Sequence, residues 1–399
     1  MPIFSRTQKT PLGIYIHIPF CLSKCEYCDF YSLPHANDDL MDRYLRALCT
    51  HIRETGPQAP GYRVDTGYFG GGTPSYFGAD RLSAVLAAIR ESFDVDPAAE
   101  ITFEANPESV NLKLLRRLYR EGFNRISLGV QSDDDALLFN LGRPHTYADA
   151  KEAVRLARKA GFRNLSVDLI FGLQDQSLHS WLITLANVLE LKPEHISCYG
   201  LRVEEATPLQ RYYHLLDIPN DEQQADMYLS AVELLRKRGY HQYEISNFAQ
   251  RGKHSKHNLK YWTGGEYLGF GPRASSDFAG KRFEVVEDLK AYISGIEEHE
   301  QVLRHVYEIP LRERAGEYLI TRLRTTYGIT RAEFEATYLL SFDPIEQELE
   351  RCFHSGHALC INARWRLTPE GFLLNNLILR ELLKALDYSI LLGNKKKNS

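Results

Sequence analysis

Apolar and polar residues over about the first 200 positions form two recurring patterns, a short apolar run and a longer amphipathic stretch. The run Ile14 to Ile18 is closed by Pro19 and predicts a buried strand. The stretch that follows predicts a helix with Asn37 as its N-cap. One face of this helix is apolar and consists of Leu40, Tyr44, Leu45, Leu48 and Ile52. Together they make one β/α step.

The same step recurs up to residue 200. Further strands are predicted at residues 66–69, 101–103, 125–130, 165–170 and 196–199. Helices are predicted between them, around residues 82–93, 114–118, 147–160 and 181–189, with a stop near Gly122 after the second. Such alternation implies parallel strands joined by right-handed crossovers. The fold class is therefore α/β, as a doubly wound sheet or a full or partial (β/α) barrel.

The pattern changes beyond Glu204. Residues 222–237 predict a helix, and the aromatic and glycine-rich segments 240–248 and 267–283 predict antiparallel strands. Helix patterns return from Pro310 onwards.

A possible short hairpin at residues 359–367 interrupts these last helices, which suits a small winged-helix-like appendage. We expect four parts: an α/β unit over 1–210, an antiparallel and helical extension over 211–309, a helical appendage over 310–390, and a solvated tail over 391–399.

Composition narrows the class of protein. The 399 residues are 44% hydrophobic and 25% charged, which is typical of a folded globular chain. The net charge of −4 argues against a general binder of nucleic acids or anionic membranes. No run of 18 apolar residues occurs, and the stretch Met1 to Thr10 has no apolar signal-peptide core, so we expect a cytoplasmic protein.

Seven cysteines are too few for a disulfide scaffold, but Cys21, Cys25 and Cys28 cluster as C-x3-C-x2-C directly after the first strand. In a barrel this loop lies at the mouth where active sites form. A structural zinc site needs four ligands, whereas a [4Fe-4S] cluster held by three cysteines keeps one iron open for a further ligand. The alternatives are three incidental buried thiols or a zinc site with a remote fourth ligand. We regard Cys49 and Cys198 as small core residues.

Polar residues at the ends of other predicted strands agree with a common site. The glycines before Thr73 allow a ligand to approach the backbone closely. Glu104 closes the third strand, Gln131 closes the fourth, Arg143 lies in the loop after it, and Asp168 falls within the fifth. Each of these residues alone is equally consistent with a capped loop or a surface pair.

The cysteine motif on this loop resembles that of the radical S-adenosylmethionine (SAM) superfamily. In that family SAM binds the open iron. One electron from the reduced cluster then splits the SAM sulfonium to give a 5′-deoxyadenosyl radical. Residues 12–210 are similar to the oxygen-independent coproporphyrinogen oxidase branch. The shared motifs are Y-I-H-I-P-F-C, G-G-G-T-P-S, F-E-A-N-P-E-S, L-G-V-Q-S and D-L-I-F-G-L. The resemblance implies a partial six-stranded (β/α) barrel that binds both a [4Fe-4S] cluster and SAM.

The resemblance also implies which residues contact SAM. They are Tyr15, Gly71, Gly72, Thr73, Glu104, Gln131, Arg143 and Asp168. Gly71 and Gly72 would meet the methionine end of SAM. Tyr27 and Phe30, on either side of Cys28, would pack against it, or else belong to an ordinary apolar barrel mouth.

Two departures from the oxidases favour the similar HemW-type haem chaperones. The oxidases carry a further cysteine after the third, where this chain has Asp29-Phe30, and they have a longer arm than the 20 residues that precede Cys21. The run His257-Asn258-Leu259-Lys260-Tyr261-Trp262 also matches the H-N-x-x-Y-W motif of the HemW type.

This motif could bind haem, because a neutral imidazole at His257 can ligate iron while Tyr261 and Trp262 cover the porphyrin. Without the resemblance, a hydrogen-bonded loop histidine beside two buried aromatics is the simpler interpretation. His254 is either a competing ligand or a solvated side chain. Ser275 replaces a histidine that is usual in the HemW type, and Arg273 could instead meet a propionate.

A second group of potential metal ligands lies in the appendage, where Cys352, His354, His357 and Cys360 fall within nine residues. It crosses a predicted helix end and a strand, so we do not expect a metal there.

The leading hypothesis is a haem-binding chaperone with a haem-accepting partner and an electron donor, and with no nucleic acid. Two enzyme functions remain as alternatives. One is the oxidative decarboxylation of coproporphyrinogen III, and the other is a different radical reaction on a tetrapyrrole, such as methyl transfer with ring opening.

Overall fold

The computed structural model describes residues 9–205 and 207–397. Most of the polar start of the chain, Met1 to Thr10, lies outside these ranges, as do the last two residues of the expected tail. Within the described residues, no helix has the length and apolar character needed to span a membrane.

Six parallel strands form the centre of one twelve-stranded sheet. They are β1 (Thr10–Ile18), β4 (Tyr62–Gly71), β5 (Val95–Ala105), β6 (Arg125–Gln131), β7 (Leu165–Phe171) and β8 (His195–Gly200). The sheet curves without closing, since its outer strands pair on one side only. This confirms the predicted partial barrel.

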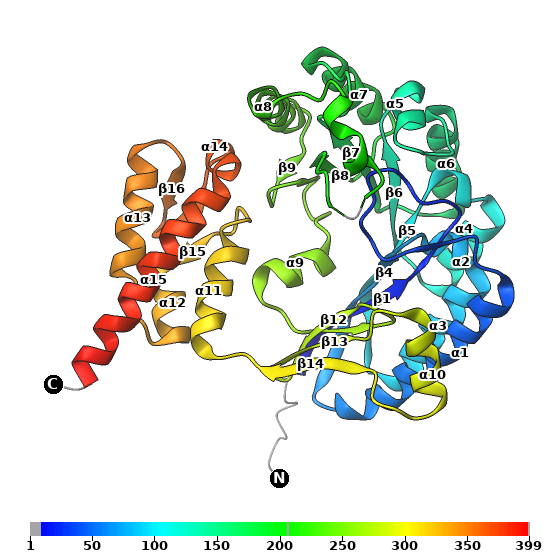
Figure 1. Cartoon of the computed structure of the whole chain (residues 1–399), viewed down its shortest axis with the longest axis horizontal. Helices are drawn as coiled ribbons and strands as arrows, with labels where there is room; N and C mark the ends of the chain where they lie inside the picture. Colours follow the sequence, from blue (N-terminus) through cyan, green and yellow to red (C-terminus); the bar gives the residue numbers. More distant parts are fainter. Residues whose placement is uncertain (1–8, 206, 398–399) are drawn as a thin grey trace, which may run out of the picture.

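Helices cover the outer face of these strands (Figure 1). The main ones are α1 (Asp38–Thr55), α3 (Ala79–Ser92), α4 (Leu112–Glu121), α6 (Tyr147–Ala160) and α7 (Leu178–Glu190). Shorter elements at the loops are β2 (Phe20–Cys21), β3 (Leu33–Pro34), α2 (Pro74–Phe77) and α5 (Asp135–Asn140). Single 3-10 turns occupy Gly56–Gln58, Pro107–Ser109, Leu209–Arg211 and Tyr213–Leu215.

Local chemistry sets the ends of these helices. Asn37 caps α1 by accepting the backbone N–H of Leu40 at 2.9 Å. Gly122 ends α4 with φ +100°, a left-handed conformation that glycine adopts without strain. Both predictions are confirmed.

The extension lengthens the sheet at both edges. Its elements are α8 (Asp221–Lys237), β9 (His241–Gln242), β10 (Asn247–Ala249), α9 (Lys256–Thr263), β11 (Tyr267–Phe270), β12 (Ser275–Phe278), β13 (Lys281–Val285), α10 (Leu289–Glu297) and β14 (Leu303–Glu308). Strands β9 and β10 continue antiparallel from β8, and β12 and β13 are antiparallel beyond β11, as predicted. Strand β14, which pairs antiparallel with β13, lies outside the predicted segments. Strand β11 pairs antiparallel with β12, as predicted, but it also pairs parallel with β1, which was not predicted, because the chain first crosses through α9.

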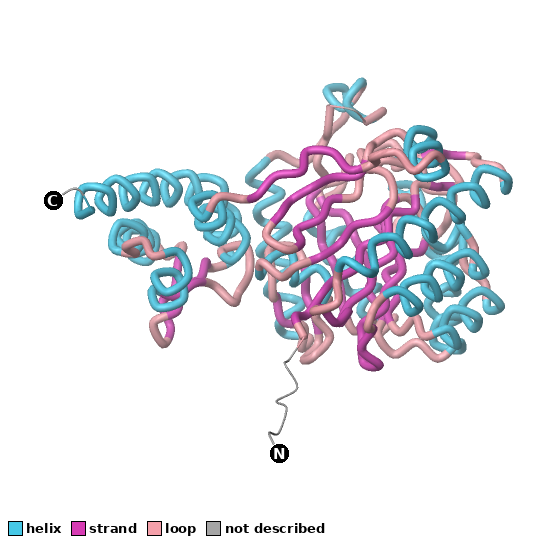
Figure 2. Tube along the Cα trace, turned by 90° about the horizontal axis from the view of Figure 1, so that it is seen from below, coloured by secondary structure: helices cyan, strands magenta, loops and turns pink. Residues whose placement is uncertain are grey.

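The C-terminal module stands beside the barrel (Figure 2). It contains α11 (Leu311–Arg322), β15 (Ile329–Thr330), α12 (Arg331–Tyr338), α13 (Asp343–His354), β16 (Ala358–Ile361), β17 (Arg364–Leu367), α14 (Pro369–Leu373) and α15 (Asn375–Lys397). The hairpin of β16 and β17 confirms the predicted one, and β15 joins it in a three-stranded sheet. The tail expected from residue 391 instead continues α15 as far as Lys397.

Candidate functional site

A cavity of about 390 Å³ opens at the carboxyl ends of the parallel strands, a size typical of small-molecule sites. Its walls include the three clustered cysteines and most of the residues expected at a SAM site. These are Cys21, Cys25, Tyr27, Cys28, Phe30, Gly71, Gly72, Thr73, Glu104, Gln131, Arg143 and Asp168. Residues spread over 148 positions of the sequence therefore share one cavity.

The cysteine loop is held against the barrel by backbone contacts. Strand β2 pairs with β3 on the far side of the loop, and the Glu26 N–H donates to the Leu141 carbonyl at 3.1 Å. Burial raises the pKa of the Cys21 thiol, and it raises the pKa of Cys28 to about 11. Nearby cysteines add to both shifts, so the three sulfur atoms lie within electrostatic reach of one another.

No group of three or more His, Cys, Asp or Glu side chains in residues 9–205 and 207–397 is arranged to hold one metal ion. A [4Fe-4S] cluster makes a different demand, because each thiolate binds a different iron and the sulfur atoms must stand further apart.

Bare glycine backbone forms the wall next to the cysteine loop. Gly71 has φ +111°, and a Cβ added there would lie 2.7 Å from the His17 ring. A Cβ on Gly72 would lie 2.7 Å from the Phe20 carbonyl and 3.0 Å from the Cys21 sulfur. The absence of side chains here keeps the strand end close to the cysteine loop.

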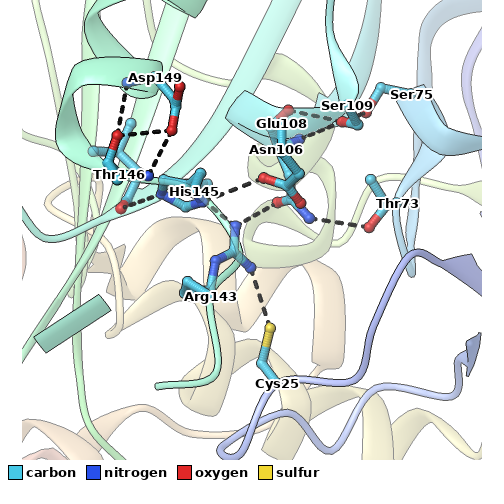
Figure 3. Close-up of polar contacts among 12 residues, drawn as sticks. Cys25, Thr73, Ser75, Asn106, Glu108, Ser109, Arg143, His145, Thr146 and Asp149 are labelled. Carbon is cyan, nitrogen blue, oxygen red and sulfur yellow. Dashed lines mark hydrogen bonds and ion pairs between the residues drawn. The ribbon is translucent and has the colours of Figure 1, made fainter. Parts of the chain in front are cut away.

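A polar chain connects two of the cysteines, and Figure 3 shows the part that runs from Cys25 to Thr73. Arg143 directs Nη1 toward the Cys25 sulfur at 3.4 Å and donates from Nη2 to Asn106 Oδ1 at 2.7 Å. Asn106 donates to the Thr73 hydroxyl at 3.1 Å, and that hydroxyl lies 3.4 Å from the Cys21 sulfur. Arg143 therefore places positive charge beside the expected cluster ligands, where it favours their thiolate form.

Two carboxylates line the cavity deeper in the barrel. Glu104 accepts hydrogen bonds from the Tyr68 hydroxyl at 2.7 Å and from the Gly71 N–H at 3.3 Å. Burial raises the pKa of Glu104 to about 7, although both hydrogen bonds oppose this shift. Asp168 accepts from the hydroxyls of Ser127 and Ser197 at 2.8 and 2.6 Å.

Two predicted SAM contacts differ from the rest. Tyr15 is not among the cavity-lining residues, and its hydroxyl lies 3.1 Å from His17 Nδ1. Phe30 lines the cavity but its side chain is 64% exposed, so it lies at the rim rather than in the core of the mouth.

The segment expected to bind haem is closed in this structure. His257 is fully buried, and both ring nitrogens have partners, Nδ1 with the Thr66 hydroxyl at 3.0 Å and Nε2 with the Tyr261 hydroxyl at 2.8 Å. Burial lowers the pKa of His257 to about 3. Trp262 lies under the Arg324 guanidinium at 5.9 Å. Both ring nitrogens of His257 are therefore engaged in this structure, and haem ligation by His257 stays a prediction.

The alternative haem contacts are engaged elsewhere. His254 stacks on Tyr243 and bonds to the Tyr327 hydroxyl at 3.2 Å. Ser275 lies in β12, paired with Glu284, and Arg273 is an exposed residue 3.6 Å from Glu287.

The four potential metal ligands of the appendage do not converge on one ion within the described chain. His354 Nδ1 bonds to the Glu350 carbonyl and His357 Nδ1 to the Ser355 hydroxyl, while Cys360 is exposed on β16. Cys49 and Cys198 are buried, as predicted for core residues.

The sequence interpretation missed several polar residues that line the cavity, among them Asn106, Arg125 and His195. A signal was present for Arg125, which begins a predicted strand with polar or glycine residues at every second position, Arg125, Ser127, Gly129 and Gln131.

Comparison with known proteins agrees with this geometry. Residues 15–188 match the model of the Radical SAM superfamily. The chain is 34% identical to "Heme chaperone HemW" of Lactococcus lactis, over 94% of this chain and 97% of that protein. It is also 34% identical to the protein of that name from Escherichia coli, over 94% and 98% of the two chains.

A solved structure, coproporphyrinogen III oxidase (HemN) from Escherichia coli, shares the fold with a TM-score of 0.80 at 24% identity. It covers 95% of this chain and 90% of its own. Identity of about one third over nearly the whole length of both chains establishes the family more finely than the fold does. This chain belongs to the HemW family of radical SAM proteins.

Proposed function

We propose that this protein is a haem chaperone that carries a [4Fe-4S] cluster and binds SAM beside it. The observation that carries the proposal is the cysteine loop, which brings three thiols and no fourth cysteine to a cavity walled by bare glycine backbone. The other four cysteines, Cys49, Cys198, Cys352 and Cys360, do not line this cavity.

The residues present fit both groups. Cys21, Cys25 and Cys28 would hold the cluster, with Arg143 offsetting the negative charge of the thiolates. Gly71 and Gly72 line the cavity and would present bare backbone to the methionine part of SAM. A Cβ at either position would collide with neighbouring protein atoms. A reduced cluster would supply an electron for the cleavage of SAM.

Further hydrogen-bonding groups would orient SAM within the cavity. Glu104 and Asp168 present carboxylate oxygens to it, and Gln131 presents an amide from a bulged strand end with φ +66°. Thr73 would fix the position of the Cys21 sulfur through its hydroxyl.

The haem part of the proposal rests on the relatives, which carry the name "Heme chaperone HemW". A cytoplasmic location, delivery to an acceptor protein and an electron donor are parts of the same proposal. Since His257 is enclosed, haem would engage the His257 to Trp262 segment only if α9 moves away from Thr66.

Anaerobic reconstitution with iron and sulfide, followed by titration with SAM and haem, tests the proposal. We expect iron–sulfur absorption, saturable SAM binding, and a Soret spectrum on adding haem. Product analysis with coproporphyrinogen III should find no loss of carboxylates. Loss of carboxylates would identify an oxidase, and methylated or ring-opened haem would identify a tetrapyrrole-modifying enzyme.

A matched pair of variants tests the cluster ligands. Cys25→Ser should abolish the iron–sulfur absorption because one iron loses its thiolate. Cys49→Ser changes a buried cysteine on α1, outside the cavity, and should retain the absorption. Equal iron contents in the two variants would refute the ligand assignment.

A further inference from the structure

The interior of this barrel is polar where barrels of this kind are usually filled with branched apolar side chains. Register shows how the polar positions align across the strands. Thr102 of β5 pairs with Arg125 of β6, and Asp168 of β7 pairs with Ser197 of β8. The polar residues that line the cavity below its mouth are Tyr68, Glu104, Arg125, Ser127, Asp168, His195 and Ser197.

The two acids in this interior are satisfied by neutral donors. Asp168 receives hydrogen bonds from Ser127 and Ser197, and a third, at 3.2 Å, from the Ser166 hydroxyl. Glu104 receives its bonds from Tyr68 and from the Gly71 backbone. Neither carboxylate forms an ion pair with a basic side chain within the described ranges.

Arg125 is the charged side chain in this interior that lacks a hydrogen-bonding partner among the described residues. Its side chain belongs to a residue only 1% exposed, and it faces the cavity. Within the described part of the chain its guanidinium has no hydrogen bond or ion pair, and its Nε is buried without a partner. Its charge reaches Glu100 and Glu104 only through space, where it lowers the pKa of both against the larger effect of burial.

Glu100 is the acid best placed to compete for Arg125, yet it is already engaged. One of its carboxylate oxygens accepts the backbone N–H groups of Lys256 and His257, at 2.9 and 3.2 Å. These bonds attach Glu100 to the start of α9, which leaves Arg125 directed at the cavity instead.

A buried cation without a partner is strongly unfavourable, and a ligand that pairs with it gains an interaction that water would otherwise weaken. We propose that Arg125 anchors a carboxylate group of the ligand that enters this cavity. The planar guanidinium matches two carboxylate oxygens. Glu104 and Asp168 nearby disfavour a doubly charged phosphate more than a singly charged carboxylate.

This inference rests on the proposed function, because that function supplies the two candidate ligands. SAM has one carboxylate, and haem has two propionates. The shared chemistry is the carboxylate, and the two sources can be separated by ligands that lack it.

The experiment compares each ligand with a partner that has lost its carboxylate. SAM is paired with decarboxylated SAM, and haem with haem dimethyl ester. Dissociation constants are measured on the anaerobically reconstituted full chain for the wild type and for Arg125→Gln. We expect Arg125→Gln to weaken the binding of one of the two carboxylate ligands, SAM or haem, by roughly tenfold to a hundredfold. Binding of the matching carboxylate-free ligand should weaken much less.

The pair that shows this difference identifies the source of the carboxylate. Equal losses for both members of each pair would overturn the inference, because they would mean that Arg125 only supports the fold through Glu100. No loss in either pair would overturn it as well. A wild type that binds no haem would refute the proposed function, while the SAM pair would still test Arg125.

Two further variants guard against misfolding. Arg125→Lys keeps the positive charge but loses the planar guanidinium that matches two carboxylate oxygens. This variant should bind the carboxylate ligand with intermediate affinity and still prefer that ligand to its carboxylate-free counterpart. Arg158→Gln removes an arginine paired with Glu194 outside the cavity and should change none of the four constants.

Discussion

Single residues at this site are fixed by contacts that only the folded chain contains. Gly71 illustrates this, because its φ of +111° and the His17 ring 2.7 Å from a would-be Cβ both exclude a side chain. Gly78 has a similarly positive φ of +95°, but a Cβ there would meet nothing within 4 Å. A side chain at Gly78 would therefore cause backbone strain alone, whereas a side chain at Gly71 would cause both strain and a steric collision.

Gly71→Ala should therefore impair the protein more than Gly78→Ala, because it should affect SAM binding as well as the free energy of unfolding. Both variants introduce backbone strain of about 1 kcal/mol, and only Gly71→Ala also displaces His17 and narrows the SAM side of the cavity. We expect a lower free energy of unfolding in both and at least about tenfold weaker SAM binding in Gly71→Ala alone. Chemical denaturation and SAM titration measure these effects. Equal SAM affinity in the two variants would contradict the proposed position of SAM.

Sequence predicted some site residues better than others for physical reasons. The cysteine spacing and the strand ends at Glu104 and Gln131 are local patterns, so they identified the cavity wall. Enclosure of His257 depends on Thr66, which is 191 residues away, and spacing carries no trace of that contact. Arg125 was missed because an arginine at the start of a strand usually points to solvent.

At the scale of elements, apolar periodicity and caps predicted the parallel strands and their helices, because both are local properties. The direction of β11 was not predictable in this way. It depends on α9 crossing between two edges of the sheet, and the sequence of β11 is the same for either direction. The connection between the short strands β9 and β10 places one buried acid, Glu244, against Thr325 of the C-terminal module.

Glu244 should make stability depend on pH. Burial raises its pKa from 4.5 to about 7, although hydrogen bonds from nearby groups, the Ser246 N–H among them, oppose the shift. The folded chain thus keeps a proton that the unfolded chain has lost, so stability falls as pH rises from about 4.5 through about 7. Relative to Glu244→Gln, the wild type should lose roughly 3 kcal/mol between pH 4.5 and 8.

Urea unfolding of both proteins at pH 5 and pH 8 measures this difference. Glu233→Gln is the control, because Glu233 is an exposed acid paired with Lys237 on the surface of α8. It should not reproduce the loss at high pH. A difference between wild type and Glu244→Gln that stays constant with pH would show that Glu244 does not titrate in this window.

At the scale of the whole molecule, the C-terminal module is attached to the segment that contains the H-N-x-x-Y-W motif. Backbone bonds cross the junction from the Ile245 N–H to the Arg324 carbonyl at 2.9 Å and from the Thr326 N–H to the Tyr243 carbonyl at 3.0 Å. The Arg324 side chain also covers Trp262. A movement of the C-terminal module should therefore change how far Trp262 of the motif is exposed.

Arg324→Ala should loosen this junction without altering the cavity at the cysteines. Losing the cation–π contact removes about 1 kcal/mol, and the amides of Ile245 and Thr326 should exchange hydrogen faster. The fluorescence of Trp262 should shift as its ring gains contact with water. Arg380→Ala, which removes an exposed ion pair with Glu381 on α15, should change neither signal. Equal amide exchange rates in both variants would contradict this prediction. They would mean that the backbone hydrogen bonds alone hold the C-terminal module, and that Trp262 can be uncovered without moving the module.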